Sequence, residues 1–248
     1  MKAFVTPELF DRGVRVTQAG QGMARSVAEV SLTFTLSLLH RVSEMHAQIV
    51  AGGWYDAART GVQHEIYGST IAVIGASRTG RCYIDLVRAL GAHVLVVDPT
   101  LTAEDAAGLG CELSSLDDAL RRAQIVALHA PTLPATHHLL GARELALMPD
   151  GAGLVNTARS WLVDEAALIT ELAAGRIAAA LDVFDAEPLE AQSGLRSLPN
   201  VLLTPHRAAG TREGRLRQGS IIADEVAAFA AGRALQHAVG PTQLTAMG

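Results

Sequence analysis

The chain has 248 residues, of which 49% are apolar and 18% charged, and its formal net charge at pH 7 is −5. This balance supports a sizeable core, and without a basic block we expect no nucleic-acid partner. Cys82 and Cys111 lack zinc-site or redox-motif spacing, and residues 1–12 lack the apolar segment of a secretion signal. We therefore expect a reduced, cytoplasmic protein. The most apolar helical stretch, residues 27–39, contains Glu29 and four serine or threonine residues, which argues against a membrane span.

A long helix is the first major element predicted from the sequence. A short strand at residues 14–17 and a flexible joint at Gly20 and Gly22 precede it, and the helix itself is expected over residues 25–50. Apolar residues surround nearly all of its first half, so it needs cover on more than one side. We expect a homodimer formed through this helix. Complete burial within one subunit is the open alternative.

From residue 70 onward, apolar strands alternate with helical patterns. This rhythm predicts an α/β fold with a doubly wound parallel (Rossmann) sheet, whose ligand crevice lies beyond the carboxyl ends of the strands. A final helix is expected over 211–232, followed by a loosely specified tail. The strands are predicted at 70–75, 93–98, 124–129, 152–156, 177–181 and 201–204, and the helices between them at 79–90, 116–122, 142–148 and 164–174.

The turn after the first strand predicts a phosphate cradle. Gly75 and Gly80 open a helix whose free amides and positive dipole end favour a phosphate, as in a dinucleotide fingerprint. Ser77 replaces the middle glycine, and its hydroxyl would either bond a phosphate oxygen or crowd it. Asp98 ends the next strand 23 residues after Gly75, close to the ~20 expected for a ribose-binding acid, and no Arg or Lys follows at once. NAD is therefore favoured over NADP, although an ordinary strand-to-helix turn remains an alternative.

Polar side chains follow the ends of three later strands. Arg159, Glu187 and His206 fall in these segments, where the crevice of a parallel sheet lies. An arginine suits bidentate binding of a substrate carboxylate, and a histidine suits proton transfer near neutral pH. A carboxylate fixes the histidine tautomer. Each residue alone also fits an ordinary surface loop, so the joint placement is what favours hydride chemistry on a 2-hydroxy or 2-oxo acid.

Several segments together resemble the D-isomer-specific 2-hydroxyacid dehydrogenase family. The resemblance extends from about Val14 to Leu235. The segments that carry it are 26–29, 128–131 with Thr136, 156–159, 162–168, 180–188 and 200–206.

The resemblance implies a role for each matching residue. Arg159 would bind the substrate carboxylate and carbonyl, His206 would be the general acid/base, and Glu187 would pair with His206. Asp182 would hold the nicotinamide carboxamide, and Arg78 would help the glycine turn to hold the pyrophosphate. The full set implied for NAD is Gly75, Ser77, Arg78, Thr79, Gly80, Asp98, His129, Ala130, Pro131, Thr136, Thr157, Ala158, Asp182 and His206. No metal site is expected, because no carboxylate or cysteine completes the histidines 129, 137 and 138.

The chain also departs from the family pattern. Residues 1–22 match only a remnant of the substrate domain and hinge, 23–210 the NAD-binding domain, and 211–248 the segment that returns to the substrate domain. A lobe of about 100 residues is expected ahead of the long helix. Three explanations of its absence are open: a start codon assigned too late, a truncated product, or a genuine short form. Trp161 replaces a small residue after the arginine and is expected to narrow the site.

The sequence thus predicts an NAD-dependent oxidoreductase of 2-hydroxy or 2-oxo acids. The alternative is a module that binds NAD(H) as a sensor or dimerisation platform without turnover.

Overall fold

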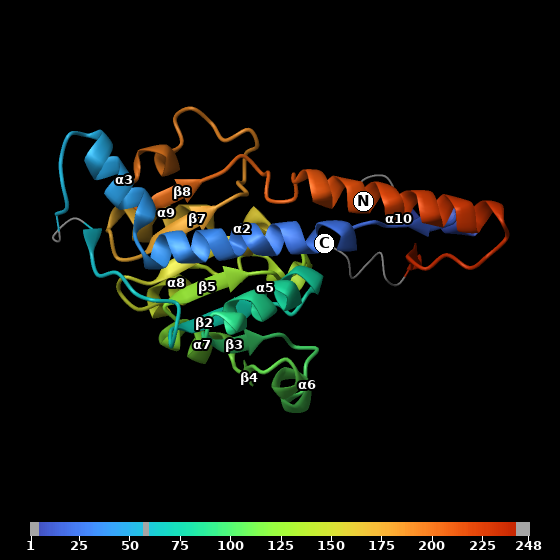
Figure 1. Ribbon diagram of the computed structural model, residues 1–248, viewed down its shortest axis with the longest axis horizontal. Coiled ribbons are helices and arrows are strands. Elements are labelled where there is room, and N and C mark those ends of the chain that lie inside the picture. Colours follow the sequence, from blue (N-terminus) through green and yellow to red (C-terminus); the bar gives the residue numbers. More distant parts are fainter. Residues whose placement is uncertain (1–4, 57–59, 242–248) are drawn as a thin grey trace.

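A seven-stranded parallel sheet forms the centre of the molecule (Figure 1). The computed structural model describes residues 5–56 and 60–241. The strand order is β4-β3-β2-β5-β6-β7-β8, so the direction of winding reverses between β2 and β5. This is the predicted doubly wound Rossmann fold. Its strands are β2 (Thr70–Ile74), β3 (His93–Val97), β4 (Glu112–Leu113), β5 (Ile125–Leu128), β6 (Gly153–Asn156), β7 (Ala178–Leu181) and β8 (Val201–Leu203).

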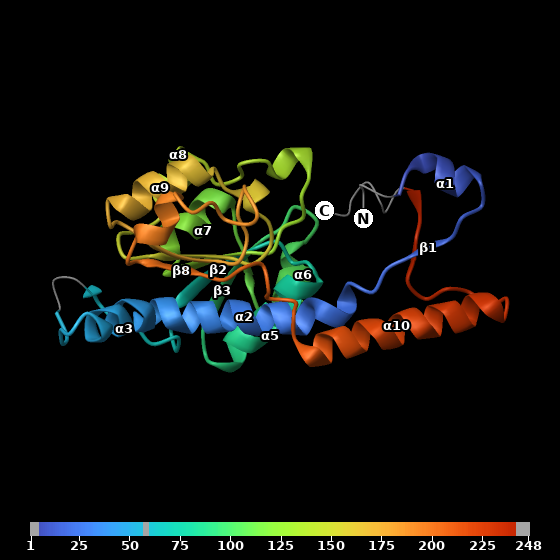
Figure 2. The same cartoon turned by 90° about the horizontal axis from the view of Figure 1, so that it is seen from above.

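Both faces of the sheet are buried, because apolar residues alternate between two cores. In β2, Ile71 and Val73 belong to one core, whereas Ala72 and Ile74 belong to the other. This continuous apolar run is typical of a central parallel strand. Figure 2 shows the helices of each face on opposite sides of the sheet. One face carries α2 (Gln21–Leu39), α5 (Arg78–Ala89) and α6 (Ala103–Gly108), and the other α7 (Leu116–Arg122), α8 (Ala142–Leu147) and α9 (Glu165–Ala173).

The single helix predicted over 25–50 is wrong, because the chain breaks it in two. Helix α2 ends at Leu39, and α3 (Val42–Val50) begins after Arg41, which adopts a left-handed backbone with φ 54°. The Arg41 guanidinium donates from Nη2 to the Gly151 carbonyl at 2.9 Å and from Nη1 to Glu44 at 3.2 Å. The bend is therefore fixed by a distant carbonyl. One side of α2 is buried in its own domain, whereas α3 has no buried residue.

The two ends of the described chain form an extension beside the domain (Figure 2). Helix α10 (Arg212–Ala230) projects from α2, and α1 (Pro7–Asp11) lies near β1 (Val16–Thr17). Strand β1 pairs antiparallel with β9 (Ala238–Val239), a strand that the sequence did not predict in the tail. The buried Glu225 of α10 joins these strands. Its carboxylate accepts hydrogen bonds from Thr17 Oγ1 and from the amides of Gln236 and His237.

Within the described residues, no helix is both long enough and apolar enough to cross a bilayer.

Candidate cofactor and active site

The turn between β2 and α5 has room only for glycine at two positions. Gly75 has φ 98°, and a Cβ on it would lie 2.6 Å from the amide nitrogen of Ala130. A Cβ on Gly80 would lie 2.2 Å from the Gly75 carbonyl oxygen. The turn therefore packs closely against the loop after β5, against the backbone of Ala130 at Gly75 and near the His129 Cβ at Gly80. Its amides lie at the positive end of a twelve-residue helix, an arrangement that suits a pyrophosphate.

Ser77 is the N-cap of α5. Its Oγ accepts a hydrogen bond from the Gly80 amide at 3.2 Å, as an N-cap serine normally does. The hydroxyl therefore serves the helix as an acceptor, and its hydrogen is still able to donate to a ligand. The neighbouring Arg78 is exposed at the first position of the helix.

Asp98 follows β3 and is held by the same turn. Its Oδ2 accepts from the Ala76 amide at 2.8 Å, and its Oδ1 accepts from the Thr100 amide and hydroxyl at 2.9 and 2.7 Å. Partial burial raises the pKa of Asp98, but these hydrogen bonds and the charge of Arg81 outweigh it and hold the pKa below its ordinary value. An ionised acceptor with a fixed position suits a ribose diol.

A cavity of about 460 Å³ lies beyond the carboxyl ends of the strands. Ten of the predicted site residues line it, namely Ser77, Thr79, His129, Ala130, Pro131, Thr157, Ala158, Arg159, Asp182 and His206. Gly75, Arg78, Gly80, Asp98, Thr136 and Glu187 do not line it. The lining residues that the sequence analysis did not single out for the site are Gly20, Met23, Val27, Thr132, Ala208 and Ala209.

His206 and Glu187 form a pair at the edge of this cavity. The Nδ1 atom of His206 lies 2.7 Å from Oε2 of Glu187, whose Oε1 accepts from the Phe184 amide at 3.1 Å. Desolvation raises the pKa of Glu187, but the hydrogen bonds from His206 and Phe184, with the charges of His206 and Arg159, leave it lowered. An ionised Glu187 requires a donor, so the proton lies on Nδ1 and Nε2 is the second functional atom of the ring.

Asp182 fastens the loop that carries His206. The carboxylate is 1% exposed and accepts from Thr204 Oγ1 at 2.5 Å, from the Arg207 amide at 2.9 Å and from the Ala208 amide at 2.8 Å. These three donors bracket His206, whose φ of 51° is unusual for a residue with a side chain. The resemblance implied a contact with the cofactor for Asp182. The structure additionally shows it holding the histidine loop.

Asn156 has a similar function for the arginine loop and was not predicted as a site residue. Its Nδ2 donates to the Arg159 carbonyl at 2.9 Å, and its Oδ1 accepts from the Ala158 amide at 3.1 Å. Asn156 is buried, whereas Arg159 is exposed and donates to the adjacent Ala158 carbonyl at 2.6 Å. A polar residue at the very end of an apolar strand was the available signal.

Two predicted residues of the loop after β5 differ in their surroundings. His129 is 4% exposed, and its Nε2 has no hydrogen-bond partner among the described residues. Burial lowers the pKa of His129 to about 3, so the ring is neutral. Thr136 instead bonds within the loop, donating to the Pro131 carbonyl at 2.7 Å and accepting from the Leu133 amide at 2.9 Å. It shapes the loop rather than the cavity surface.

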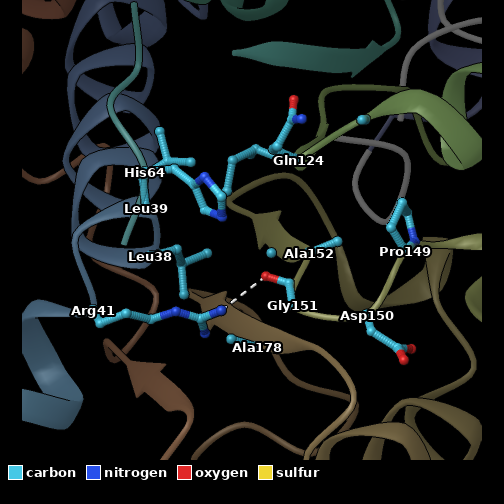
Figure 3. Close-up of a pocket in the computed structure, with 13 residues that line it drawn as sticks. Leu38, Leu39, Arg41, His64, Gln124, Pro149, Asp150, Gly151, Ala152 and Ala178 are labelled. Atoms are coloured by element: carbon cyan, nitrogen blue, oxygen red, sulfur yellow. Dashed lines mark hydrogen bonds between the residues drawn. The ribbon is translucent and has the colours of Figure 1, made fainter. Parts of the chain in front are cut away.

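A second cavity lies at the opposite, amino ends of the strands (Figure 3). Leu38, Arg41 and Gly151 line it, and Arg41 reaches across to the Gly151 carbonyl. Gln124, also in its wall, accepts a hydrogen bond from the Thr70 amide at 2.6 Å. In neither cavity does the described chain bring together three His, Cys, Asp or Glu side chains that would hold a metal ion.

Known proteins similar to this chain share both its sequence and its fold. The family described as "D-isomer specific 2-hydroxyacid dehydrogenase, NAD binding domain" matches residues 32–208. A D-3-phosphoglycerate dehydrogenase of Methanocaldococcus jannaschii is 35% identical over 218 residues, which cover 87% of this chain and 41% of that protein. A glyoxylate reductase of Aeropyrum pernix is 36% identical, with 89% of this chain and 68% of that protein covered. The crystal structure of a Lactobacillus jensenii D-lactate dehydrogenase with NAD+ has a TM-score of 0.87 and 28% identity, covering 96% and 76% of the two chains.

Proposed function

The chain belongs to the D-isomer specific 2-hydroxyacid dehydrogenase family, and we propose that it transfers a hydride between NAD(H) and a 2-hydroxy or 2-oxo acid. The observation that carries the proposal is that Arg159 and His206 line one cavity beside the glycine turn, and that Glu187 pairs with His206 at 2.7 Å. A guanidinium, a carboxylate–imidazole pair and a phosphate cradle are together what such a reaction requires.

The residues present fit a dinucleotide. The Gly75–Gly80 turn, with Ser77, Arg78 and Thr79, would hold the pyrophosphate, and Asp98 would hold the adenosine ribose. The loops after β5, β6 and β7 would complete the cofactor site with His129, Ala130, Pro131, Thr157, Ala158 and Asp182, and Thr136 would hold the first of these loops in shape. When bound, NADH supplies the hydride.

The chain's own residues supply the remaining chemistry. Arg159 would bind the carboxylate of the 2-oxo acid through its free guanidinium N–H groups. His206 in its imidazolium form would donate the Nε2 proton to the oxygen on carbon 2, and would take it back in the oxidative direction. Glu187, ionised because its pKa is lowered, would keep the ring oriented and stabilise the imidazolium.

The test combines cofactor binding with turnover. NADH is titrated by calorimetry, and a panel of 2-oxo acids is then followed by loss of nicotinamide absorbance. His206→Ala should lower kcat by about 10²–10⁴-fold, the range of a general acid/base, and leave NADH affinity nearly unchanged. His93→Ala, at an exposed position away from the site, is the matched control. Surviving turnover in His206→Ala, or NADH affinity lost with it, would contradict the assigned role.

The second candidate function is an NAD(H)-binding module without turnover. The chain spans 41% to 45% of the length of the D-3-phosphoglycerate dehydrogenases that it matches, so turnover must be tested separately from cofactor binding. Tight NADH binding with no turnover of any 2-oxo acid would support this alternative.

We further propose that the protein is a homodimer in which α3 and the loop after it meet a second copy. Seven large apolar side chains of this segment are more than a third exposed, which is unusual for the surface of a monomer: Val42, Ile49, Val50, Trp54, Tyr55, Val62 and Tyr67. Sedimentation of Val50→Asp should show a monomer. Leu90→Asp, which changes an exposed leucine outside the segment, should sediment like the unmodified protein.

A further inference from the structure

Two loops face each other across the cavity at the carboxyl ends of the strands. The loop after β5 contributes Pro131 and Thr132 to the lining, and the loop after β6 contributes Ala158 and Arg159. By the proposed function the first loop holds the cofactor and the second holds the acid. The distance between them therefore sets how the two reactants meet.

Trp161 joins these loops on the outer side of the cavity. Its indole Nε1 donates to the Leu133 carbonyl at 3.0 Å, and its own carbonyl accepts from the His138 amide at 2.9 Å. The indole also lies against the His137 ring, with 4.1 Å between ring centroids and an angle of 54°. His137 in turn stacks on His138 at 3.9 Å. One side chain thus makes both a polar and an aromatic contact with the opposite loop.

These contacts are the polar ties nearest the cavity. Between residues 129–138 and 156–161, all of which the structure describes, both hydrogen bonds that cross involve Trp161. The next ties lie farther along the chain, where the Leu140 amide donates to the Leu162 carbonyl at 3.0 Å. A small residue at position 161 keeps the backbone bond and loses the other two contacts.

Trp161 does not act by filling the site. The side chain is absent from the cavity lining and the residue is 39% exposed, so the predicted narrowing of the site by Trp161 is not seen. Trp161 instead contacts Leu133, His137 and His138 of the loop after β5, and none of these three residues lines the cavity.

We propose that Trp161 is a positioning residue that fixes the Arg159 loop relative to the cofactor loop. The proposal rests on the proposed function for its effect on the reaction, but the tie between the loops is independent of it. Once NADH orders the loop after β5, that order is transmitted through Trp161 to the loop that binds the acid.

Hydrogen exchange measures the tie without any need for turnover. Amides of residues 133–138 should exchange about fivefold faster in Trp161→Ala than in the unmodified protein, the factor expected for one lost hydrogen bond. Trp161→Phe keeps an aromatic ring and loses only the N–H donor, so its exchange rate should lie between the two. Phe229→Leu, which changes an exposed aromatic residue of α10, is the control and should exchange like the unmodified protein. Equal rates in all four proteins would overturn the proposal.

Addition of NADH then tests the transmission. In the unmodified protein NADH should protect amides in both loops, 130–138 and 159–163, whereas in Trp161→Ala the protection should stay in the first. For the 2-oxo acid that gives the fastest turnover, KM should rise about tenfold in Trp161→Ala while kcat and NADH affinity change less, and Trp161→Phe should recover part of the loss. Equal protection of both loops and an unchanged KM in Trp161→Ala would overturn the positioning role.

Failure of the proposed function has a different signature. An unmodified protein that neither binds NADH nor turns over a 2-oxo acid would end the proposed function and the transmission with it. The exchange difference measured without ligand would still record the tie between the loops.

Discussion

The two ends of the parallel sheet both carry a cavity bordered by an arginine, yet they use charged groups in opposite ways. At the amino ends, Arg41 is itself the fastener: its side chain is 10% exposed and holds both the Gly151 carbonyl and Glu44. At the carboxyl ends, Asn156 and Asp182 do the fastening from buried positions. Arg159 and Nε2 of His206 are thereby left for a ligand.

This difference shows why a charged cavity alone is weak grounds for a functional site. In the amino-end cavity of Figure 3, the Arg41 guanidinium already donates to Glu44 and the Gly151 carbonyl, and the Gln124 side-chain oxygen already accepts from the Thr70 amide. Catalysis needs polar groups that are held in place and still free at their reacting atoms. Of these two cavities, the one at the carboxyl ends has such groups among the described residues, in Arg159 and His206.

The largest effect is expected from a substitution that prevents the glycine turn from approaching the backbone of the loop after β5. Gly75→Ala places a Cβ 2.6 Å from the Ala130 amide on a backbone with φ 98°, so the turn must shift. NADH affinity measured by calorimetry should fall at least about 100-fold, and the melting temperature should fall with it. Gly108→Ala, at a helical position with open space around it, should leave NADH affinity unchanged. Normal NADH binding by Gly75→Ala would remove the carboxyl end as the cofactor site.

The next largest effect concerns the fastener of the histidine loop. The Asp182 carboxylate accepts hydrogen bonds from three donors of this loop. Asp182→Asn replaces one of the two carboxylate oxygens with an NH₂ group, so at least one of these buried donors loses its acceptor. We expect the free energy of unfolding to fall by about 1–3 kcal/mol and kcat to fall about 100-fold because His206 loses its position. Chemical denaturation and turnover assays check both values. Asp185→Asn, at a neighbouring exposed position, should change neither of them.

At the amino ends, the change should affect stability alone. Arg41→Met leaves the Gly151 carbonyl and the half-buried Glu44 without their partner, which should cost about 2–4 kcal/mol of unfolding free energy. Burial already raises the pKa of Glu44, with Arg41 opposing the rise. The folded state therefore binds this proton more readily than the unfolded state, and the loss in Arg41→Met should shrink as the pH falls through the pKa of folded Glu44. Altered NADH affinity in Arg41→Met would contradict the view that the amino-end cavity serves stability alone. Arg121→Met removes an exposed arginine and is the control for the change in stability.

The smallest effect is expected in the extension, where the Glu225 carboxylate holds β1 and the segment before β9 together. Hydrogen bonds from Thr17 and from the amides of Gln236 and His237 lower its pKa. The stabilisation it gives is thus present above the ordinary pKa of a glutamate and is lost as the pH falls through the lower, folded value. The protection factors of amides 236–239, which correct for the intrinsic pH dependence of exchange, should fall over that acidic range. In Glu225→Gln the protection factors should be lower throughout and should not fall further with pH.

The sequence predicted those parts of the fold that local patterns determine. The runs of Val, Ile, Leu and Ala placed six strands to within about one residue, because parallel strands buried on both faces leave a continuous apolar signal. The two-residue strands β4 and β9 were not predicted, whereas the equally short β1 lies within the strand predicted at residues 14–17. The break at Arg41 was missed because it depends on a carbonyl 110 residues away, and arginine alone favours a continuous helix.

The candidate site also combines features that local sequence patterns determine with features that depend on distant contacts. Parallel topology brings strand ends together, so Arg159, Glu187 and His206 were expected at one edge of the sheet. In the structure Arg159 and His206 line the same cavity and Glu187 pairs with His206, whereas their chemical roles stay a prediction. The fastening by Asn156 and Asp182 depends on how each loop folds back over its strand end. The lining by Met23 and Val27 depends on how α2 crosses the sheet. Spacing along the chain carries neither kind of information.

The pairing of β1 with β9 brings two stretches separated by more than 200 residues into register, beside the domain and away from the sheet. A fluorophore at Val14 would therefore label the extension, and another in the loop between β5 and α8 would label the Rossmann domain. The segment before α2 and the start of α10 connect these two parts. Energy transfer between the dyes would report any swing of the extension across the crevice, in real time and with no chemistry taking place.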